Sequence, residues 1–464
     1  MAIKFGTDGW RAVIADEFTF ENLKKISKAT AIAFEKHPKL GNGIVIGYDT
    51  RFLSKEFAEC AAEVFANHGI KVHLTDSFVT TPTVSLLSRD KNLAYGVMIT
   101  SSHNPAKYNG FKLKDEFGGS MGPKHLSVIE KELENSAAFD YGSKSFSELI
   151  DAGKIEYIKG REYYINTLKE KIETGKIKDS GLRIIYDAMY GSGQGMMDGL
   201  INITALRSEV NPSFGGSSPE PVAKNLSLIS SEMKSGKYDI GIVTDGDADR
   251  IAVFEENGEF VDAQKTFALL LTYMLEEKKM TGGVVRGFSS SELIKKICDN
   301  YGIKLYTVPI GFKYISELMI KEDILIGAEE SGGIGLKHHL PERDGIFNGM
   351  MFAEMLAVKK KKMSTLIGEI EDKYGKFYYK RIDQHLSSNE LKSELIEQAS
   401  KLKEVAGLKV VGIDNLDGCK LLFDNGWLLV RASGTEPLLR IYTETFGVNK
   451  TDDILKDILQ KFKI

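Results

Sequence analysis

Short apolar segments alternate with amphipathic helical segments along this chain, and that alternation restricts its fold more than any other feature. Residues 44–48 (Ile-Val-Ile-Gly-Tyr) have the continuous apolar character of a buried strand, and a helical pattern follows from Ser54 to about Asn67. Further strands are predicted at residues 71–75 and 95–100. Strands that alternate with helices indicate βαβ units and a mostly parallel sheet.

The same arrangement recurs twice further along the chain. Residues 183–187 and 283–286 are apolar segments, and we expect a turn of small residues and then a helix after each. The chain has 464 residues, and a prior of roughly 100–200 residues per domain allows three or four domains. We therefore expect an α/β fold with three similar domains and mostly parallel mixed sheets, over residues 1–153, 154–257 and 258–370.

The remaining residues, 371–464, have a different pattern. Strands are predicted at residues 378–386, 408–412, 427–431 and 439–443, and a helix from about Asp452 closes the chain. Strands that follow one another before a helix indicate a smaller C-terminal α+β domain.

Composition excludes several classes of function. The net charge is −4, so there is no basic excess for a nucleic-acid partner. No apolar run approaches the roughly 20 residues that span a bilayer, and the N-terminus resembles no signal peptide, so we expect a cytoplasmic protein without a membrane partner. Cys60, Cys298 and Cys419 are far apart, which indicates neither a disulfide framework nor a zinc site. Monomer and homodimer both stay open.

Residues 100–105 (Thr-Ser-Ser-His-Asn-Pro) form a polar loop directly after a predicted strand. Ligands of α/β sheets bind at the carboxyl ends of strands. A serine there can act as a nucleophile or carry a phosphoryl group, although a simple serine-rich turn is the alternative. The GxSxG pattern is absent from this loop, which argues against acyl transfer.

A second loop places Asp245, Asp247 and Asp249 at alternate positions after the apolar segment 239–244. Three such carboxylates can converge on one hard cation, and Mg²⁺ prefers oxygen ligands. A calcium-binding EF-hand loop also begins with this spacing, but it needs glycine at its sixth position, where this chain has Arg250. The loop is therefore predicted to bind Mg²⁺.

Three more polar, glycine-containing loops are candidate binding elements. Residues 327–333 offer carboxylates and a hydroxyl to sugar hydroxyls, although an ordinary loop stays open. Residues 431–437 combine an arginine, two hydroxyls and a glycine, which suits a phosphate cradle. Residues 6–11 form a polar loop that ends in Arg11.

Taken together and in this order, the loops resemble those of the α-D-phosphohexomutase family, from Gly6 to Arg440. The resemblance implies that Ser102 is the phosphorylated residue and a metal ligand with Asp245, Asp247 and Asp249. It also implies catalytic roles for Arg11, Lys112 and Arg250, and either Lys112 or His103 as the group that takes the hydroxyl proton. The implied substrate-binding residues are Lys313, Glu329, Ser331, Arg431, Ser433, Gly434 and Thr435.

The resemblance further implies four domains around a central cleft, Mg²⁺ as cofactor and a hexose 1,6-bisphosphate, glucose 1,6-bisphosphate, as activator. The expected reaction interconverts hexose 1-phosphate and hexose 6-phosphate, with glucose as the favoured sugar and mannose as the second. Glu329-Glu330-Ser331 is similar to the glucomutase form, whereas Gly332-Gly333 lacks a histidine that some members have there. The alternatives are a phosphoglucosamine mutase, a metal-dependent sugar phosphatase and an inactive sugar-phosphate-binding protein.

Overall fold

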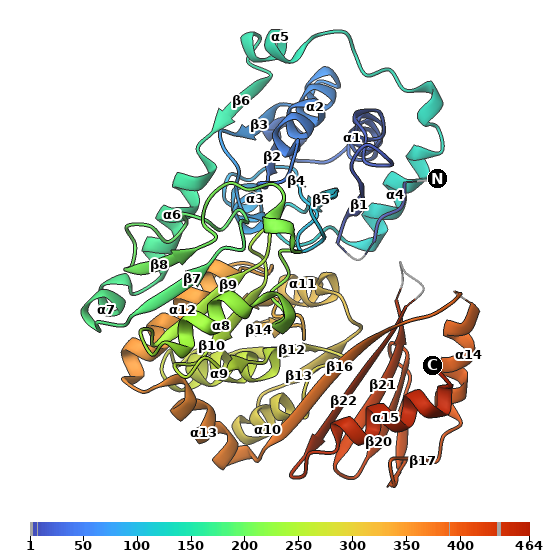
Figure 1. Ribbon diagram of the computed structural model, residues 1–464. Coiled ribbons are helices and arrows are strands. Elements are labelled where there is room, and N and C mark those ends of the chain that lie inside the picture. The colour runs from blue at the N-terminus through green and yellow to red at the C-terminus, as the bar shows by residue number, and fades with distance from the viewer. Residues whose placement is uncertain (1–2, 7, 389, 434–437) are drawn as a thin grey trace.

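The computed structural model describes residues 3–6, 8–388, 390–433 and 438–464. These residues form four sheets of four to six strands and one two-stranded sheet. We call the parts of the chain built on the four larger sheets the first to fourth units. Figure 1 shows the first unit at the top, the second and third adjoining below it, and the fourth at the lower right.

The first unit is a six-stranded mixed sheet with helices on both faces. Its strand order is β1 (Trp10–Val13), β5 (Tyr108–Lys114), β4 (Gly96–Ile99), β2 (Ile44–Tyr48), β3 (Val72–Thr75) and β6 (Ile155–Ile158). The pairs from β4 to β6 are parallel and the other two are antiparallel. One face packs on α1 (Phe20–Ala33) and α2 (Ser54–Asn67), and the other packs on α3 (Thr81–Asp90). The strands and the helix predicted between residues 44 and 100 are confirmed.

The second and third units each contain a mixed sheet. The second has the order β11 (Phe260–Val261), β10 (Ile251–Phe254), β9 (Ile240–Thr244), β7 (Ile184–Asp187) and β8 (Ile203–Leu206). The third has the order β13 (Leu305–Val308), β12 (Gly283–Gly287), β14 (Ile324–Ala328) and β15 (Ile334–Leu336). The remaining helices up to residue 374 are α4 (Pro123–Leu133), α5 (Phe146–Asp151), α6 (Gly160–Lys171), α7 (Thr174–Asp179), α8 (Ser227–Lys234), α9 (Ala263–Glu276), α10 (Glu292–Tyr301), α11 (Phe312–Lys321), α12 (Gly345–Lys359) and α13 (Met363–Tyr374).

One hydrophobic core serves both of these units. Helix α12 is buried along nearly its whole length, and its Ile346 and Met350 belong to the same cluster as Ile242 of β9 and Val284 of β12. Gly349 makes this packing close, because a Cβ there would lie 2.7 Å from the Ile242 side chain. The two units therefore depend on each other for their burial.

The fourth unit is an antiparallel sheet with the order β16 (Phe377–His385), β22 (Leu438–Phe446), β21 (Gly426–Ala432), β20 (Cys419–Phe423) and β19 (Gly412–Asp414). Helices α14 (Glu390–Ser400) and α15 (Thr451–Phe462) cover one face. The single strand predicted at 408–412 is wrong. Gly407, at a φ of +75°, reverses the chain so that β18 (Leu408–Lys409) pairs with β17 (Glu404–Val405), and β19 starts afterwards.

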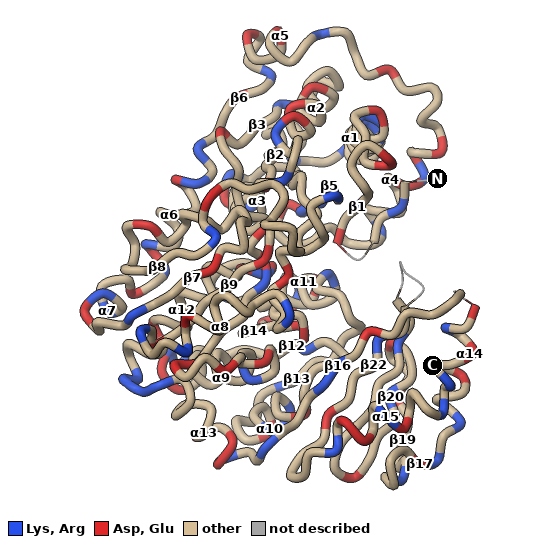
Figure 2. Tube along the Cα trace, in the orientation of Figure 1, with Lys and Arg blue, Asp and Glu red and all other residues tan. Residues whose placement is uncertain are grey.

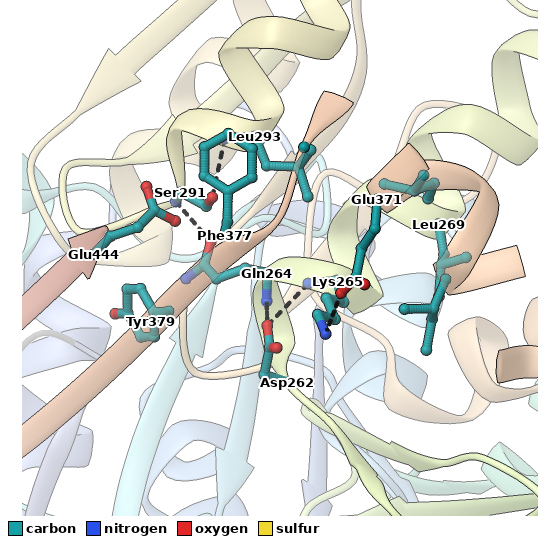
Figure 3. Close-up of a pocket in the computed structure, with 13 residues that line it drawn as sticks. Asp262, Gln264, Lys265, Leu269, Ser291, Leu293, Glu371, Phe377, Tyr379 and Glu444 are labelled. Carbon is teal, nitrogen blue, oxygen red and sulfur yellow. Dashed lines mark hydrogen bonds and ion pairs between the residues drawn. The ribbon is translucent and has the colours of Figure 1, made fainter. Parts of the chain in front are cut away.

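The third and fourth units meet around a small pocket lined by both polar and apolar side chains, and around an apolar cluster. Figure 3 shows the pocket, where Gln264 Oε1 accepts the Ser291 N–H at 2.8 Å. Glu444 Oε2 accepts the Trp427 Nε1–H at 3.1 Å nearby. The apolar cluster contains Trp427, Leu429 and Tyr442 from the face of the fourth sheet that α14 and α15 do not cover. The third unit contributes Phe288 and Ile310.

One expectation about the second unit is wrong. A helix was predicted after the strand at 183–187, but residues 188–202 form a series of turns. Met189 and Tyr190 have φ angles of +48° and +60°, which a right-handed helix does not allow. The segment instead packs against the loop of Asp245, Asp247 and Asp249, where the Ser192 N–H donates to Gly246 O at 2.9 Å.

The predicted domain ranges stay predictions, and strand pairing argues for moving two of their boundaries. β6 lies beyond residue 153 but pairs with β3, and β11 lies beyond residue 257 but pairs with β10. We propose that the first unit extends to Ile158 and the second to Val261. The central cleft also stays a prediction. Figure 2 shows positive and negative residues interspersed over all four units. None of the described helices is both long and apolar enough to cross a bilayer.

Ile242→Ala should destabilise the second and third units together, because the shared core loses a buried side chain. For a fully buried isoleucine we expect a loss of about 2–5 kcal/mol in the free energy of unfolding. Hydrogen exchange followed by mass spectrometry should then show faster exchange in both β9 and β12. Ile441→Ala, in the separate core of the fourth unit, is the control and should leave these strands protected. Unchanged exchange in β12 with faster exchange in β9 would mean that the two units unfold independently.

Candidate active site

A buried arginine, Arg51, holds the loop that carries Ser102. Its terminal nitrogens donate to four backbone carbonyl oxygens, those of Ser102 (2.6 Å), Asn104 (2.7 Å), Pro105 (3.0 Å) and Tyr108 (3.1 Å). Its Nε lies 3.1 Å from Asp49 Oδ2, and both side chains are fully buried. Because a guanidinium is planar and all its donors are fixed relative to one another, this contact set fixes the path of the loop backbone.

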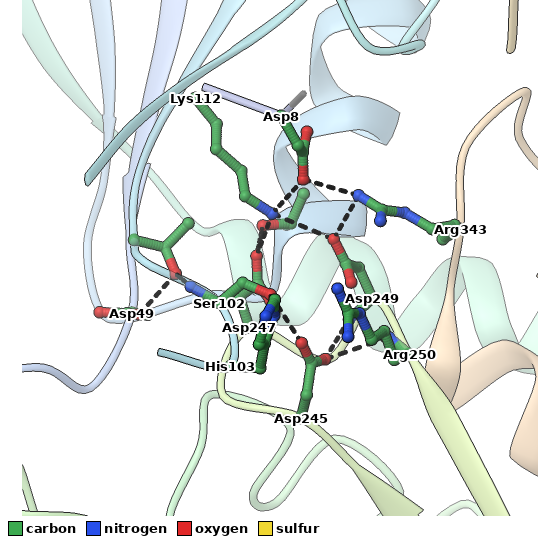
Figure 4. Close-up of polar contacts among 12 residues, drawn as sticks. Asp8, Asp49, Ser102, His103, Lys112, Asp245, Asp247, Asp249, Arg250 and Arg343 are labelled. Carbon is green, nitrogen blue, oxygen red and sulfur yellow. Dashed lines mark hydrogen bonds and ion pairs between the residues drawn. The ribbon is translucent and has the colours of Figure 1, made fainter. Parts of the chain in front are cut away.

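Ser102 itself has a left-handed backbone conformation, with a φ of +51°. Such a conformation costs a non-glycine residue about 1–3 kcal/mol, and the surrounding contacts have to maintain it. The Ser102 N–H donates to Thr100 Oγ1 at 2.9 Å, and the Thr100 hydroxyl donates to Asp49. The Ser102 hydroxyl donates to Asp245 Oδ2 at 2.8 Å and lies 3.2 Å from His103 Nδ1. The strained turn therefore points the hydroxyl at the aspartate cluster (Figure 4).

Asp245, Asp247 and Asp249 follow strand β9 and converge, as the sequence predicted. Each offers a carboxylate oxygen, and these oxygens lie within 4.8 Å of one another. The Oδ1 atoms of Asp247 and Asp249 are buried and have no hydrogen-bond partner among the described residues. Buried carboxylate oxygens without a donor are costly, and a bound cation removes that cost. The donor set is all oxygen, so the three residues fit Mg²⁺.

Glycine residues let the loops of three units touch at this point. A Cβ on Gly246 would lie 2.4 Å from Ser102 O, and a Cβ on Gly345 would lie 2.2 Å from Arg250 O. The Gly345 N–H also donates to Ala248 O at 2.9 Å, and the Thr81 N–H donates to Asp247 O at 3.0 Å. The aspartate loop is therefore enclosed by the first unit on one side and the third on the other.

Buried ion pairs link the three units around the aspartates. Lys112 Nζ lies 2.7 Å from Asp247 Oδ2, 3.0 Å from Asp249 Oδ2 and 2.8 Å from Asp8 Oδ2. Arg343, from the segment before α12, lies 2.7 Å from Asp8 and 2.8 Å from Asp249. Figure 4 shows these side chains pointing toward one another from the first, second and third units.

The charges shift the acidities within the cluster in opposite directions. Burial and the carboxylates of Asp247 and Asp249 raise the pKa of Asp245 well above its usual value. Burial also acts to raise the pKa of Asp8, but Lys112, Arg343 and Lys114 outweigh it and hold that pKa well below the usual value. Burial acts to lower the pKa of Lys112, and its carboxylate neighbours outweigh that effect and raise it. A divalent cation beside Asp245 would favour its ionised form.

The other predicted catalytic residues lie around Ser102. Arg11 Nη1 donates to Asn104 Oδ1 at 2.7 Å, in the same loop. The Arg250 N–H donates to Asp245 Oδ1 at 3.0 Å, whereas its buried Nε has no partner among the described residues. Burial, with the positive charges of Arg250 and Arg11, holds the pKa of His103 well below its usual value, so this imidazole is neutral at pH 7.

The predicted sugar-binding residues occupy the third unit. Glu329 directly follows β14 at the start of a turn, and its Oε2 lies 3.6 Å from Arg343 Nη1. Burial raises the pKa of Glu329 to about 7, although Arg343 opposes this. Ser331 is half-buried in the same turn. Lys313, near the start of α11, is also half-buried, and burial lowers its pKa.

Two of the predicted phosphate-binding residues, Arg431 and Ser433, are described, and both lie in the fourth unit. Arg431 is the penultimate residue of β21, and its Nε lies 2.9 Å from Asp417 Oδ2. The Ser433 N–H donates to Leu438 O at 2.8 Å, and Ser433 O accepts from Lys392 Nζ at 2.8 Å. Gly434 and Thr435 lie outside the described residues. Among the described residues no ion pair joins Arg431 to the Ser102 cluster, so their cooperation stays a prediction.

Sequence reasoning missed Asp8, Arg51 and Arg343 as parts of this site. Asp8 lies in the glycine-containing loop 6–11 and Arg51 follows the strand at 44–48, so their positions in the sequence could have indicated a role in the site. Arg343 precedes a helix in the charged segment 340–345. Its contact with Asp8 spans 335 residues of sequence, and no local pattern reveals such a pair.

Comparison with known proteins places this geometry in one family. Residues 2–139, 162–258 and 262–374 match the domains described as Phosphoglucomutase/phosphomannomutase, alpha/beta/alpha domains I, II and III. Residues 390–461 match the C-terminal domain of the same family.

Relatives similar over the full length carry two kinds of name. A phosphoglucomutase/phosphomannomutase of Thermococcus kodakarensis is 28% identical and covers 97% of this chain and 96% of its own length. A phosphoglucosamine/phosphogalactosamine mutase of Sulfurisphaera tokodaii is 27% identical and covers 98% of each. The solved structure of a candidate phosphomannomutase from Thermus thermophilus is 31% identical, covers 100% of both chains and has a TM-score of 0.86. Because all four family domains match in order and this solved relative aligns over its whole length, the chain belongs to the phosphoglucomutase/phosphomannomutase family.

Proposed function

We propose that this protein is a phosphohexomutase that interconverts hexose 1-phosphate and hexose 6-phosphate, with glucose favoured and mannose second. The contact of 2.8 Å between Ser102 Oγ and Asp245 Oδ2 carries the proposal, because it brings a hydroxyl nucleophile into a cluster of oxygen ligands. Family membership supports it. Asp245, Asp247, Asp249 and an oxygen on Ser102 would hold Mg²⁺, which supplies charge neutralisation as a Lewis acid when bound.

In the proposed cycle Ser102 carries a phosphoryl group, and the free hydroxyl of a bound hexose phosphate attacks the phosphorus. The bond from phosphorus to Ser102 Oγ breaks as the new bond forms, which gives a hexose 1,6-bisphosphate. After the sugar reverses its orientation, the other phosphoryl group returns to Ser102. The same bisphosphate, added from outside, would phosphorylate an unmodified Ser102 and so act as the activator.

His103 is the group best placed to exchange the proton. Its Nδ1 lies 3.2 Å from Ser102 Oγ, and its neutral imidazole has one ring nitrogen that can accept a proton. Lys112 Nζ already has three carboxylate partners, so we assign to it the role of a fixed positive charge. Arg250 and Arg11 would stabilise the transferring phosphoryl oxygens.

Binding of the sugar phosphate would use the third and fourth units. Glu329 and Ser331 would accept and donate hydrogen bonds to sugar hydroxyls, with Lys313 beside them. Arg431, Ser433, Gly434 and Thr435 would hold the phosphate that does not react. Holding this phosphate positions the reacting hydroxyl, and positioning is a main source of rate in phosphoryl transfer.

A phosphoglucosamine mutase is the second candidate, because a relative with that kind of name is 27% identical over 98% of this chain. A phosphatase and an inactive binding protein are the remaining alternatives.

A mutase assay on the purified protein tests the proposal. With Mg²⁺ and a trace of glucose 1,6-bisphosphate, we expect conversion of glucose 1-phosphate, slower conversion of mannose 1-phosphate and the least with glucosamine 1-phosphate. EDTA should abolish conversion, and Mg²⁺ added back should restore it. Release of inorganic phosphate without 6-phosphate would identify a phosphatase. No conversion by folded protein phosphorylated on Ser102 would contradict the proposal and leave a sugar-phosphate-binding protein or an enzyme for a sugar other than these three.

Ser102→Ala should lose turnover by about a thousandfold or more, because the phosphoryl carrier is gone. Binding of glucose 6-phosphate, measured by calorimetry, should stay within a few-fold of the wild type. Ser101→Ala is the matched control, since its buried hydroxyl has no partner among the described residues. Intact mass spectrometry should find one phosphoryl group on wild type and Ser101→Ala after incubation with glucose 1,6-bisphosphate, and none on Ser102→Ala. A phosphoryl group on Ser102→Ala would refute the assignment.

Glu329→Gln should stabilise the protein above about pH 7 while weakening sugar binding. The folded-state pKa of about 7 lies above the ordinary 4.5, so the acid form is favoured on folding. The associated stability is complete below the unfolded-state pKa and is lost as pH rises through the folded-state pKa. The difference in Tm between variant and wild type should therefore be small near about pH 4 and grow toward about pH 8. Glu394→Gln, at an exposed helix position, is the control. A difference in Tm that does not change with pH would contradict the raised pKa of Glu329.

A further inference from the structure

Asp417 lies in the turn between β19 and β20 and contacts two different units. Its Oδ2 accepts from Arg431 Nε at 2.9 Å within the fourth unit. The same oxygen accepts the backbone N–H of Ile310, in the third unit, at 2.8 Å. Its side chain is 21% exposed, so the pair is largely shielded from water. One carboxylate oxygen thus joins the proposed phosphate-binding arginine to the neighbouring unit.

The backbone beside Asp417 is shaped for this contact. Gly418 has a φ of +98°, a conformation that favours glycine. A Cβ at Gly418 would lie 2.6 Å from Val430 O and 3.1 Å from the Arg431 Cα. The turn can therefore lie directly against the end of β21 only with glycine here, which places Asp417 beside Arg431.

The other partner belongs to the segment that leads to Lys313. Ile310 is followed by Gly311 and Phe312 and then by Lys313, in the first turn of α11. The Ile310 side chain is buried against Trp427, Leu429 and Tyr442 of the fourth unit. The segment is thus attached to the fourth unit both through this apolar cluster and through the hydrogen bond to Asp417.

The contact leaves the guanidinium of Arg431 suited to an anion. An arginine that uses Nε for a carboxylate keeps both terminal nitrogens for a bidentate contact with a phosphate. The residues that the structure describes provide no hydrogen bond to those two nitrogens of Arg431. Because Nε is fixed, the plane of the guanidinium group is fixed too. Less side-chain entropy is then lost when Arg431 binds a phosphate.

We propose that Asp417 is a positioning residue that orients Arg431 for the non-reacting phosphate and couples that contact to the Lys313 segment. The proposal rests on the proposed mutase function. It goes beyond that function because Asp417 touches no substrate and acts through two other groups. Loss of Asp417 should release Arg431 and the segment 310–313 together, so sugar-phosphate binding weakens while the chemistry at Ser102 continues.

A double-mutant cycle tests the proposal. Asp417→Ala should raise KM for glucose 1-phosphate about tenfold and lower kcat by a smaller factor. Asp417→Asn keeps an acceptor for the Ile310 N–H and should raise KM less. In an Arg431→Ala background, Asp417→Ala should raise KM by a smaller factor than it does in the wild type, because only its effect on the Lys313 segment is left. Asp424→Asn, an exposed carboxylate in the next turn, is the control and should match wild type.

Two results would overturn the proposal. One is a KM for Asp417→Ala and Asp417→Asn equal to that of wild type. The other is an effect of Asp417→Ala that multiplies fully with that of Arg431→Ala, which a general loss of structure would produce. If Asp417→Ala does not fold, Asp417→Asn carries the cycle. If wild type has no mutase activity, the proposed function fails separately, and the same cycle measured by calorimetric binding of glucose 6-phosphate still decides the role of Asp417.

Discussion

The buried ion pairs between Lys112, Asp8, Arg343 and Asp249 fix the positions of the first three units relative to one another. Each unit contributes charge: Lys112 and Asp8 come from the first, Asp249 from the second and Arg343 from the third. Removing one partner from such a network costs about 3–5 kcal/mol, since an uncompensated charge then stays buried. The same charges surround the proposed reaction centre, so the relative position of the units and the electrostatics of the site have one physical origin.

Close backbone contacts also fix the relative position of these units. Gly246 and Gly345 allow main chains of different units to approach where any side chain would collide. The second and third units add a common hydrophobic core around α12. This rigidity has a cost in the site itself, where Ser102 keeps a strained backbone and Glu329 an unfavourably buried carboxyl group. Strained and desolvated groups of this kind are characteristic of functional sites.

The fourth unit is attached differently. It packs through the apolar cluster around Trp427 and through single hydrogen bonds, such as those of Asp417 and of Tyr442 to Glu330 at 3.2 Å. The pocket beside Gln264 lies at this same junction (Figure 3). Gln264 Nε2, the Tyr379 hydroxyl and Glu444 Oε1 are buried there without partners among the described residues, so a bridging water fits the pocket better than an apolar group. Interfaces of this mixed, partly polar kind are typical of domains that move relative to each other.

The sequence by itself determined the elements whose signal is local. Apolar runs located β2, β9 and β21, and the spacing of Asp245, Asp247 and Asp249 located the carboxylate cluster, because a strand end and a short loop keep such residues together. The local pattern wrongly predicted a helix after β7, where contact with the aspartate loop determines the backbone conformation. It also wrongly predicted one strand at 408–412, where the chain reverses at Gly407. Only the tertiary structure decided that Asp8, Arg51 and Arg343 support the site and that Asp417 joins two units. Their partners lie far away in sequence, and a buried charge reveals its role only when the fold brings its counter-charge within hydrogen-bonding distance.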